Sequence, residues 1–166
     1  MKKAVVIGSL NYDTSLTLER MPQPGETIPA TGITLNPGGK GANQAGGSGQ
    51  AGGVPVWMAG AVGRDAPGDA CWKLERAGVD CSHVARREEP TGQAFITVDR
   101  AGENSIVILA GANGKVTPAQ VESHRELLAR WIAWLCSWKS PWMRCLPGQS
   151  LRRLWESWWC WTPLPL

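Results

Sequence analysis

The chain has 166 residues and a net charge of +3, from 17 basic and 14 acidic residues. Domains most often contain about 100–150 residues, so the length fits one ordinary domain and excludes little else. So small a charge surplus, spread along the chain, favours neither a nucleic acid nor a membrane surface as partner. The apolar run after Met1-Lys2-Lys3 is too short for a signal peptide, and no stretch approaches the ~20 apolar residues of a membrane span. We therefore expect a cytoplasmic protein.

The expected elements follow from apolar runs separated by glycine and proline turns, a pattern typical of an α/β or α+β domain. Valine and isoleucine favour covered strands, and glycine ends helices. In chain order we expect a buried strand over Lys3–Gly8, short strands and turns at a sheet edge over Ser15–Leu35, a core strand over Val54–Val62, a helix over Asp69–Ala77 that stops at Gly78, a hairpin of Gln93–Val98 and Ser105–Leu109 turned at Asp99–Gly102, and a helix opened by Thr117-Pro118.

Composition changes near Arg130. Eight of the ten tryptophans and three of the five cysteines lie in the last 36 residues. We therefore divide the chain into a domain over residues 1–130 and a Trp-rich tail over residues 131–166. The cysteines are odd in number and lack metal-binding spacing. We interpret His83 and His124 as structural or solvated residues rather than as parts of a nucleophile–histidine–acid arrangement. We expect free thiols and no metal site.

Polar residues that could hold a ligand follow the first strand. Asn11 and Asp13 come just after it, at the strand end where open α/β sheets bind ligands. An ionised aspartate only accepts hydrogen bonds, so two hydroxyls of a polyol can donate to it, and Asn11 can donate and accept beside it. An N-x-D pattern taken alone also fits a solvated turn.

The string Gly38-Gly39-Lys40-Gly41-Ala42-Asn43 is more informative. Its glycines permit positive φ and a close backbone approach, while Lys40 and Asn43 supply donors. Backbone N–H groups that open a helix suit an oxygen-rich ligand. A glycine-rich turn without a ligand is the alternative for this string by itself.

Taken together, these motifs resemble the ribokinase family of sugar kinases. The resemblance runs in order over about 120 residues: Gly8-Ser-x-Asn11-x-Asp13, Pro24-Gly-Glu-Thr27, Gly38-Gly-Lys-Gly-Ala-Asn-Gln44, Val62-Gly-x-Asp65 with Gly68, Ala77-Gly-Val-Asp80, Thr91-Gly92, Gly102-Glu-Asn104 and Ala110-Gly-Ala-Asn113. It implies an α/β fold with a ribokinase-like parallel-sheet core, here incomplete, and a small β lid made of residues 14–36 and 92–110.

The resemblance also implies a function and a site. The function is ATP-dependent phosphorylation of D-ribose at O5, with Mg²⁺ and a monovalent cation as further cofactors, in a homodimer joined through the lid. The residues implied to bind the sugar are Asn11 and Asp13 for its hydroxyls, Gly39, Lys40, Gly41, Ala42 and Asn43 wrapped around it, and Ala94, Ile96 and Ile108 on its apolar side. Closure of the lid would keep water from the transferring phosphoryl group.

The family's catalytic segments do not occur in the chain. Neither its Gly-Ala-Gly-Asp string, which carries the catalytic aspartate, nor its Asn-x-x-Glu string, which organises magnesium, is found. We therefore assign no catalytic residue and no metal ligand, and expect the ATP and metal sites to be absent from this chain. We expect the chain to be a truncated or inactive form, with a noncatalytic sugar-binding or dimerisation module as the alternative.

Two segments look like misread coding sequence. Residues 47–52 fit the dinucleotide pattern G-x-G-x-x-G but follow no strand directly, and lie where the family has a helix that glycines would weaken by up to ~1 kcal/mol each. A one-base shift lets residues 46–52 encode Val-Ala-Ala-Gly-Arg-Leu-Gly. The opposite shift turns tryptophan codons of the tail into Leu, Val or Met and restores the family's Q-L-E-x-P. We prefer this frame-error interpretation of the tail to a nucleic-acid surface or an interfacial membrane helix.

Overall fold

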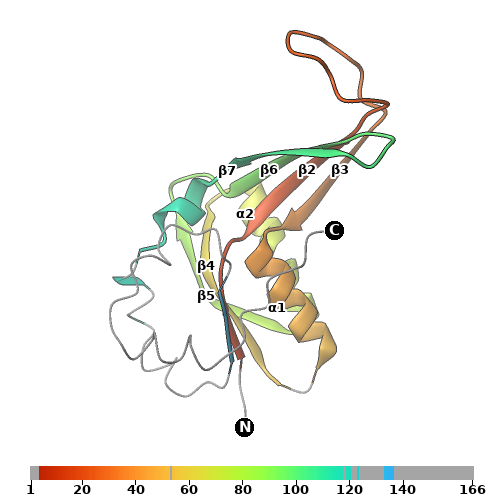
Figure 1. Ribbon diagram of the computed structural model, residues 1–166. Coiled ribbons are helices and arrows are strands. Elements are labelled where there is room, and N and C mark those ends of the chain that lie inside the picture. Colours follow the sequence, from red (N-terminus) through yellow and green to blue (C-terminus); the bar gives the residue numbers. More distant parts are fainter. Residues whose placement is uncertain (1–3, 53, 118, 121–122, 124–132, 137–166) are drawn as a thin grey trace, which may run out of the picture.

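The computed structural model describes residues 4–52, 54–117, 119–120, 123 and 133–136, which form two four-stranded sheets. The core sheet has the order β5-β4-β1-β8, and the second sheet, which we call the lid sheet, has the order β3-β2-β6-β7. The elements are β1 (Ala4–Ile7), β2 (Asn11–Thr17), β3 (Gly32–Gly38), α1 (Lys40–Ala51), β4 (Val56–Gly63), α2 (Ala66–Cys71), the 3₁₀ helix η1 (Trp72–Ala77), β5 (Val79–Arg87), β6 (Gly92–Val98), β7 (Asn104–Leu109), the 3₁₀ helix η2 (Gly111–Lys115) and β8 (Ala133–Cys136). Figure 1 shows the lid sheet projecting from one end of the core.

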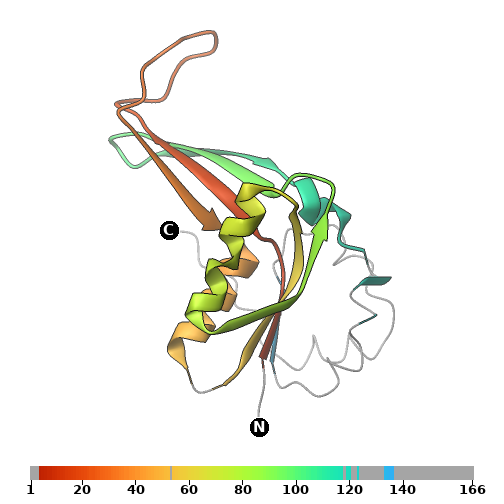
Figure 2. The same ribbon diagram turned by 180° about the vertical axis from the view of Figure 1, so that it is seen from behind.

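The core sheet is parallel and β1 lies inside it, between β4 and β8. All four β1 residues are buried, as expected for a parallel strand covered on both faces. Val6 belongs to the cluster under α1, α2 and η1, whereas Val5 and Ile7 pack with Ala112 and Val116 on the other face. Figure 2 shows α1 and α2 on one side of the sheet. The predicted α/β class and parallel core are confirmed.

The glycine-rich stretch that imitated a dinucleotide motif, residues 47–52, forms the C-terminal end of the helix α1 and its C-cap, Gly52. Its glycines are not equivalent. A methyl group at Gly47 would meet nothing within 4 Å, whereas one at Gly49 would lie 2.2 Å from the carbonyl oxygen of Ala77. Of the glycines at 47, 49 and 52, only Gly49 therefore permits close packing, here between α1 and the end of η1.

We expect Gly47→Ala to raise the free energy of unfolding by about 0.5–1 kcal/mol, because alanine lowers the backbone entropy of the unfolded chain at an open helical position. Gly49→Ala should lower it by about 1–3 kcal/mol through overpacking against backbone atoms. Urea unfolding of the two variants measures both. Equal effects of the two substitutions would contradict this account of the helix.

Three residues separate the end of β1 from β2, the first strand of the lid sheet. β2 pairs antiparallel with β3 and parallel with β6, and β6 and β7 form the predicted hairpin. The turn is held by Asp99, whose Oδ1 accepts hydrogen bonds from the backbone N–H groups of Ala101 (2.9 Å) and Glu103 (3.0 Å). Gly102 there has φ +85°, which glycine adopts without strain.

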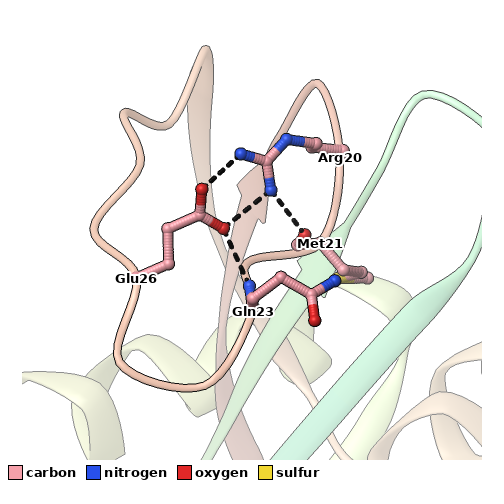
Figure 3. Close-up of polar contacts among 4 residues, drawn as sticks. All are labelled: Arg20, Met21, Gln23 and Glu26. Atoms are coloured by element: carbon pink, nitrogen blue, oxygen red, sulfur yellow. Dashed lines mark hydrogen bonds and ion pairs between the residues drawn. The ribbon is translucent and has the colours of Figure 1, made fainter.

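The tip of the lid sheet is a long loop between β2 and β3, held by one ion pair (Figure 3). Arg20 Nη1 donates to Glu26 Oε2 at 2.7 Å, Arg20 Nη2 pairs with Oε1, and the backbone N–H of Gln23 also donates to Glu26 at 2.8 Å. The Arg20 hydrogen bond, followed by the Gln23 backbone bond, lowers the pKa of Glu26 to about 2. The family-like Pro-Gly-Glu-Thr motif thus shapes the loop at the far end of the lid.

Several predicted boundaries were wrong. β2 starts at Asn11 rather than at Ser15, and the helix expected over 69–77 starts at Ala66 and turns into the 3₁₀ helix η1 before Gly78. β5 was not predicted, although Val79 and Cys81 are buried and Asp80 and Ser82 exposed in the alternation of a half-covered strand.

The expected opening of a helix at Thr117 is supported by one bond, in which Thr117 Oγ1 accepts from the backbone N–H of Gln120 at 3.2 Å. The rest of that helix lies outside the described residues. Of the Trp-rich tail, the structure describes β8 alone, which pairs parallel with β1.

Candidate functional site

The predicted lid residues share one face of the lid sheet. Asp13 lies opposite Ala94, and Ala94 lies opposite Ile108, so the three form one row across β2, β6 and β7. Asn11 and Ile96 lie two residues along their strands, on the same face, because side chains alternate with period two. Ala94 is buried, whereas Ile108 is 59% exposed. An amide, a carboxylate and apolar side chains are thereby presented together, as on a surface for an amphipathic polyol.

The glycine string approaches this face from β3. Asn11 pairs with Gly38, and α1 starts two residues later with Gly39 as its N-cap. Gly39 has φ +94°, and a methyl group there would lie 2.7 Å from Ser9 O; one at Gly41 would lie 2.7 Å from Gly8 Cα. The backbone N–H of Ala42 donates to Ser9 O at 3.1 Å. These glycines therefore let the start of α1 pack directly against the β1–β2 connection.

Lys40 and Asn43 are exposed in the first turn of α1, whereas Gly41 and Ala42 are buried. The two classes of residue therefore differ in what they can do: Gly41 and Ala42 set the backbone path, and Lys40 and Asn43 carry donors that a ligand can reach. The structure brings the α1 residues and the β2 residues together through the β2–β3 pairing.

The carboxylate of Asp13 has unused acceptor capacity. Its Oδ1 is buried and has no hydrogen-bond partner within the described part of the chain. A methyl group at Gly38 would lie 2.0 Å from its Oδ2, so the Asp13 side chain lies directly against the backbone of Gly38. Burial raises the pKa of Asp13. Since buried polar atoms are nearly always paired, an orphaned carboxylate oxygen on this face is a place for hydroxyl donors.

Two buried hydrogen-bond networks beneath this face were not predicted from the sequence. In one, Asn113 contacts Leu10 and Asn11. In the other, Thr91 Oγ1 accepts from Gly63 N at 2.9 Å and donates to Asp65 Oδ1 at 2.5 Å, which joins the end of β4 to the start of β6. Both involve motifs used for the resemblance, but no local pattern pairs residues that lie so far apart in the chain.

The described residues contain no group of three or more His, Cys, Asp or Glu side chains that could hold a metal ion. Within the same segments no helix is long and apolar enough to cross a membrane. Cys71 and Cys81 are free and buried, and burial raises the pKa of their thiols to about 12 and about 11, so neither is a nucleophile at neutral pH.

Comparisons with known proteins agree with this geometry. The pfkB family carbohydrate kinase profile matches residues 1–131. The curated ribokinase of Arabidopsis thaliana is 43% identical over 119 residues, which are 69% of this chain and 31% of that protein. The crystal structure of ribokinase from Cryptococcus neoformans var. grubii serotype A in complex with ADP superposes with a TM-score of 0.74 at 39% identity, over 88% of this chain and 45% of that one.

The structure of Arabidopsis thaliana ribokinase complexed with ribose and ATP superposes with a TM-score of 0.68 at 35% identity, over 81% of this chain and 45% of that one. The chain thus spans less than half the length of each of these relatives. The family match covers the lid sheet, three of the four core strands (β1, β4 and β5) and all the candidate site residues, whereas β8 lies beyond it. On this evidence the chain belongs to the pfkB family of carbohydrate kinases.

Proposed function

We propose that this chain is the sugar-recognition half of a ribokinase, whose intact parent phosphorylates D-ribose to D-ribose 5-phosphate with ATP. The observation that carries the proposal is the orphaned Oδ1 of Asp13 on the face shared with Asn11, Ala94 and Ile108. Hydroxyl groups are the donors that such an oxygen requires, and the apolar neighbours suit the carbon face of a furanose. The ribose and ATP in the Arabidopsis complex support the choice of ligand.

The proposed sugar contacts keep the roles predicted from the sequence. Asn11 and Asp13 hold hydroxyls, residues 39–43 wrap around the sugar, and Ala94, Ile96 and Ile108 cover its apolar side. ATP, Mg²⁺ and a monovalent cation would serve the intact parent, and for this chain we assign no catalytic residue. The chain alone should therefore bind ribose without transferring phosphate.

A calorimetric ribose titration and a ribose-dependent ATPase assay on the full chain test this proposal together. Saturable ribose binding without turnover is the expected result. Turnover would contradict the absence of a catalytic half, and failure of ribose to bind would overturn the assignment of the sugar site. Glycerol at the same concentrations is the control for nonspecific polyol binding.

We also propose that the coding sequence carries a frame error over residues 46–52 and another near Arg130. The room available for a side chain at Gly47 and Gly49 supports the first of these two frame errors. The seven residues encoded after the frame shift have alanine at position 47, where a methyl group would meet nothing within 4 Å. They keep glycine at position 49, where a methyl group would collide with Ala77 O. Resequencing the gene tests both shifts: one uninterrupted frame that encodes the Trp-rich end would refute them.

The dimer expected through the lid is supported by the face of the lid sheet opposite Asp13. Leu35, Phe95 and Val107 lie there, on the row through Thr14, and are 50%, 45% and 67% exposed. Exposed apolar patches of this kind mark interaction surfaces. We expect Val107→Asp to convert a dimer into a monomer in light-scattering chromatography without changing ribose affinity. A wild-type chain that is already monomeric would argue against the dimer.

A further inference from the structure

Asn113 holds the junction between the core and the lid. It lies in η2, is 9% exposed, and makes two hydrogen bonds to Leu10 in the β1–β2 connection and one to Asn11, the first residue of β2. Its Oδ1 accepts from Leu10 N at 3.0 Å, and its Nδ2 donates to Leu10 O at 2.9 Å and to Asn11 Oδ1 at 3.0 Å. Its neighbour Ala112 is fully buried in the cluster with Val5 and Ile7, so Asn113 is anchored to the core sheet rather than to the lid sheet.

The backbone of Leu10 fixes which way the Asn113 amide points. A backbone N–H can only donate and a backbone carbonyl can only accept, so Asn113 has one orientation that satisfies both. The atom that reaches Asn11 is therefore a donor, and the atom of Asn11 that meets it must be its carbonyl oxygen Oδ1. This leaves Nδ2 as the group that Asn11 can offer to a ligand.

The neighbouring glycine leaves room for this contact. A methyl group at Gly92 would lie 2.1 Å from Asn113 Nδ2 and 2.7 Å from Asn11 Oδ1. Gly92 pairs with Asn11 across β2 and β6, so the space is set by strand register. The Thr91-Gly92 and Ala110-Gly-Ala-Asn113 motifs thus meet at one buried contact.

We propose that Asn113 is a positioning residue that fixes Asn11 as a hydrogen-bond donor in the sugar site. With Asp13 as an acceptor two residues away on the same face, the site then selects a ligand that accepts at Asn11 and donates at Asp13. Hydroxyl groups do both, whereas an ammonium group opposite Asn11 or a phosphate opposite Asp13 does not. This inference rests on the proposed sugar site.

The substitution Asn113→Asp tests it. An aspartate keeps the bond from Leu10 N but cannot donate, so Asn11 turns its Nδ2 inward and presents Oδ1 to the ligand. We expect ribose affinity, measured by calorimetry on the full chain, to fall about tenfold or more. In an Asn11→Ala background the same substitution should cause no further loss, because Asn113 acts through Asn11.

Thr91→Val is the matched control. It breaks the other buried network at the junction, so we expect a lower Tm but a ribose affinity within twofold of wild type. Should Asn113→Asp not fold, Asn113→Ser replaces it in the same double-mutant cycle, where its loss must also vanish with Asn11→Ala. Equal losses in both backgrounds, or none in either, overturn the role of Asn113. Absence of ribose binding by the wild type would instead refute the sugar site itself.

Discussion

Asp13→Asn is expected to weaken ribose binding by at least about 100-fold while leaving the fold intact. The carboxylate can accept two charge-assisted hydrogen bonds, each worth about 1.5–3 kcal/mol, and an amide oxygen replaces them with weaker neutral bonds. The substitution is nearly isosteric, so the contact with Gly38 is preserved. Calorimetric titration with ribose measures the affinity, and thermal unfolding checks the fold.

The direction of the pKa shift adds a pH dependence. Burial raises the pKa of Asp13 in the folded, sugar-free chain. Its ionisation therefore costs stability at every pH above that raised pKa, and the cost disappears as pH falls below the unfolded value. Asp13→Asn removes the cost, so Tm at neutral pH should stay the same or rise.

Sugar hydroxyls that donate to Asp13 favour the ionised form, so ribose binding must lower its pKa. Ribose affinity should be highest at neutral pH and fall as pH drops through the raised pKa. In that pH range, ribose binding should release a proton from Asp13. Titrations in two buffers of different ionisation enthalpy detect the released proton.

Thr14→Val is the matched control for Asp13→Asn. Thr14 is the next residue of β2, but its side chain lies on the opposite face, in the row of Leu35 and Phe95. We expect its ribose affinity to stay within twofold of wild type. Comparable losses in both variants would mean that Asp13 acts through the strand rather than through a contact with the sugar.

The sequence was sufficient for features that depend on local pattern. The buried first strand, the β6–β7 hairpin and the stop at Gly78 follow from apolar runs and from glycine chemistry, and each is confirmed. The structure also brings Asn11 and Asp13 close to the glycine string through the pairing of β2 with β3, an arrangement that periodicity alone could not predict.

The sequence was insufficient where distant segments decide the outcome. Asn113 is 103 residues from Leu10, and no local pattern pairs them. From the sequence, Gly49 is expected only to weaken a helix. In the structure the carbonyl oxygen of Ala77 lies so close that position 49 has no room for a side chain. β5 was overlooked because the alternation of apolar and polar residues holds only over Val79–Ser82 and breaks at His83–Val84.

The second large effect is expected at Gly39, where backbone conformation and close packing coincide. Gly39 has φ +94° and ψ 140°, and Gly52 at the other end of α1 has φ +69° and ψ −169°. Both lie in conformations open almost only to glycine, so alanine costs about 1–3 kcal/mol of strain at either position. They differ in space, because a methyl group at Gly52 meets nothing within 4 Å, whereas one at Gly39 lies 2.8 Å from Asn11 N.

Gly39→Ala should therefore destabilise the chain by a further ~1–3 kcal/mol beyond Gly52→Ala, through overlap with backbone atoms that cannot move aside cheaply. It should also remove detectable ribose binding, since the overlap displaces the Asn11 backbone and the start of α1 together. Gly52→Ala should keep ribose affinity within twofold. Urea unfolding and ribose calorimetry on the two variants separate the cost of backbone strain from the cost of overlap with neighbouring atoms. Equal losses of stability, with ribose binding retained in both variants, would show that the start of α1 does not shape the sugar site.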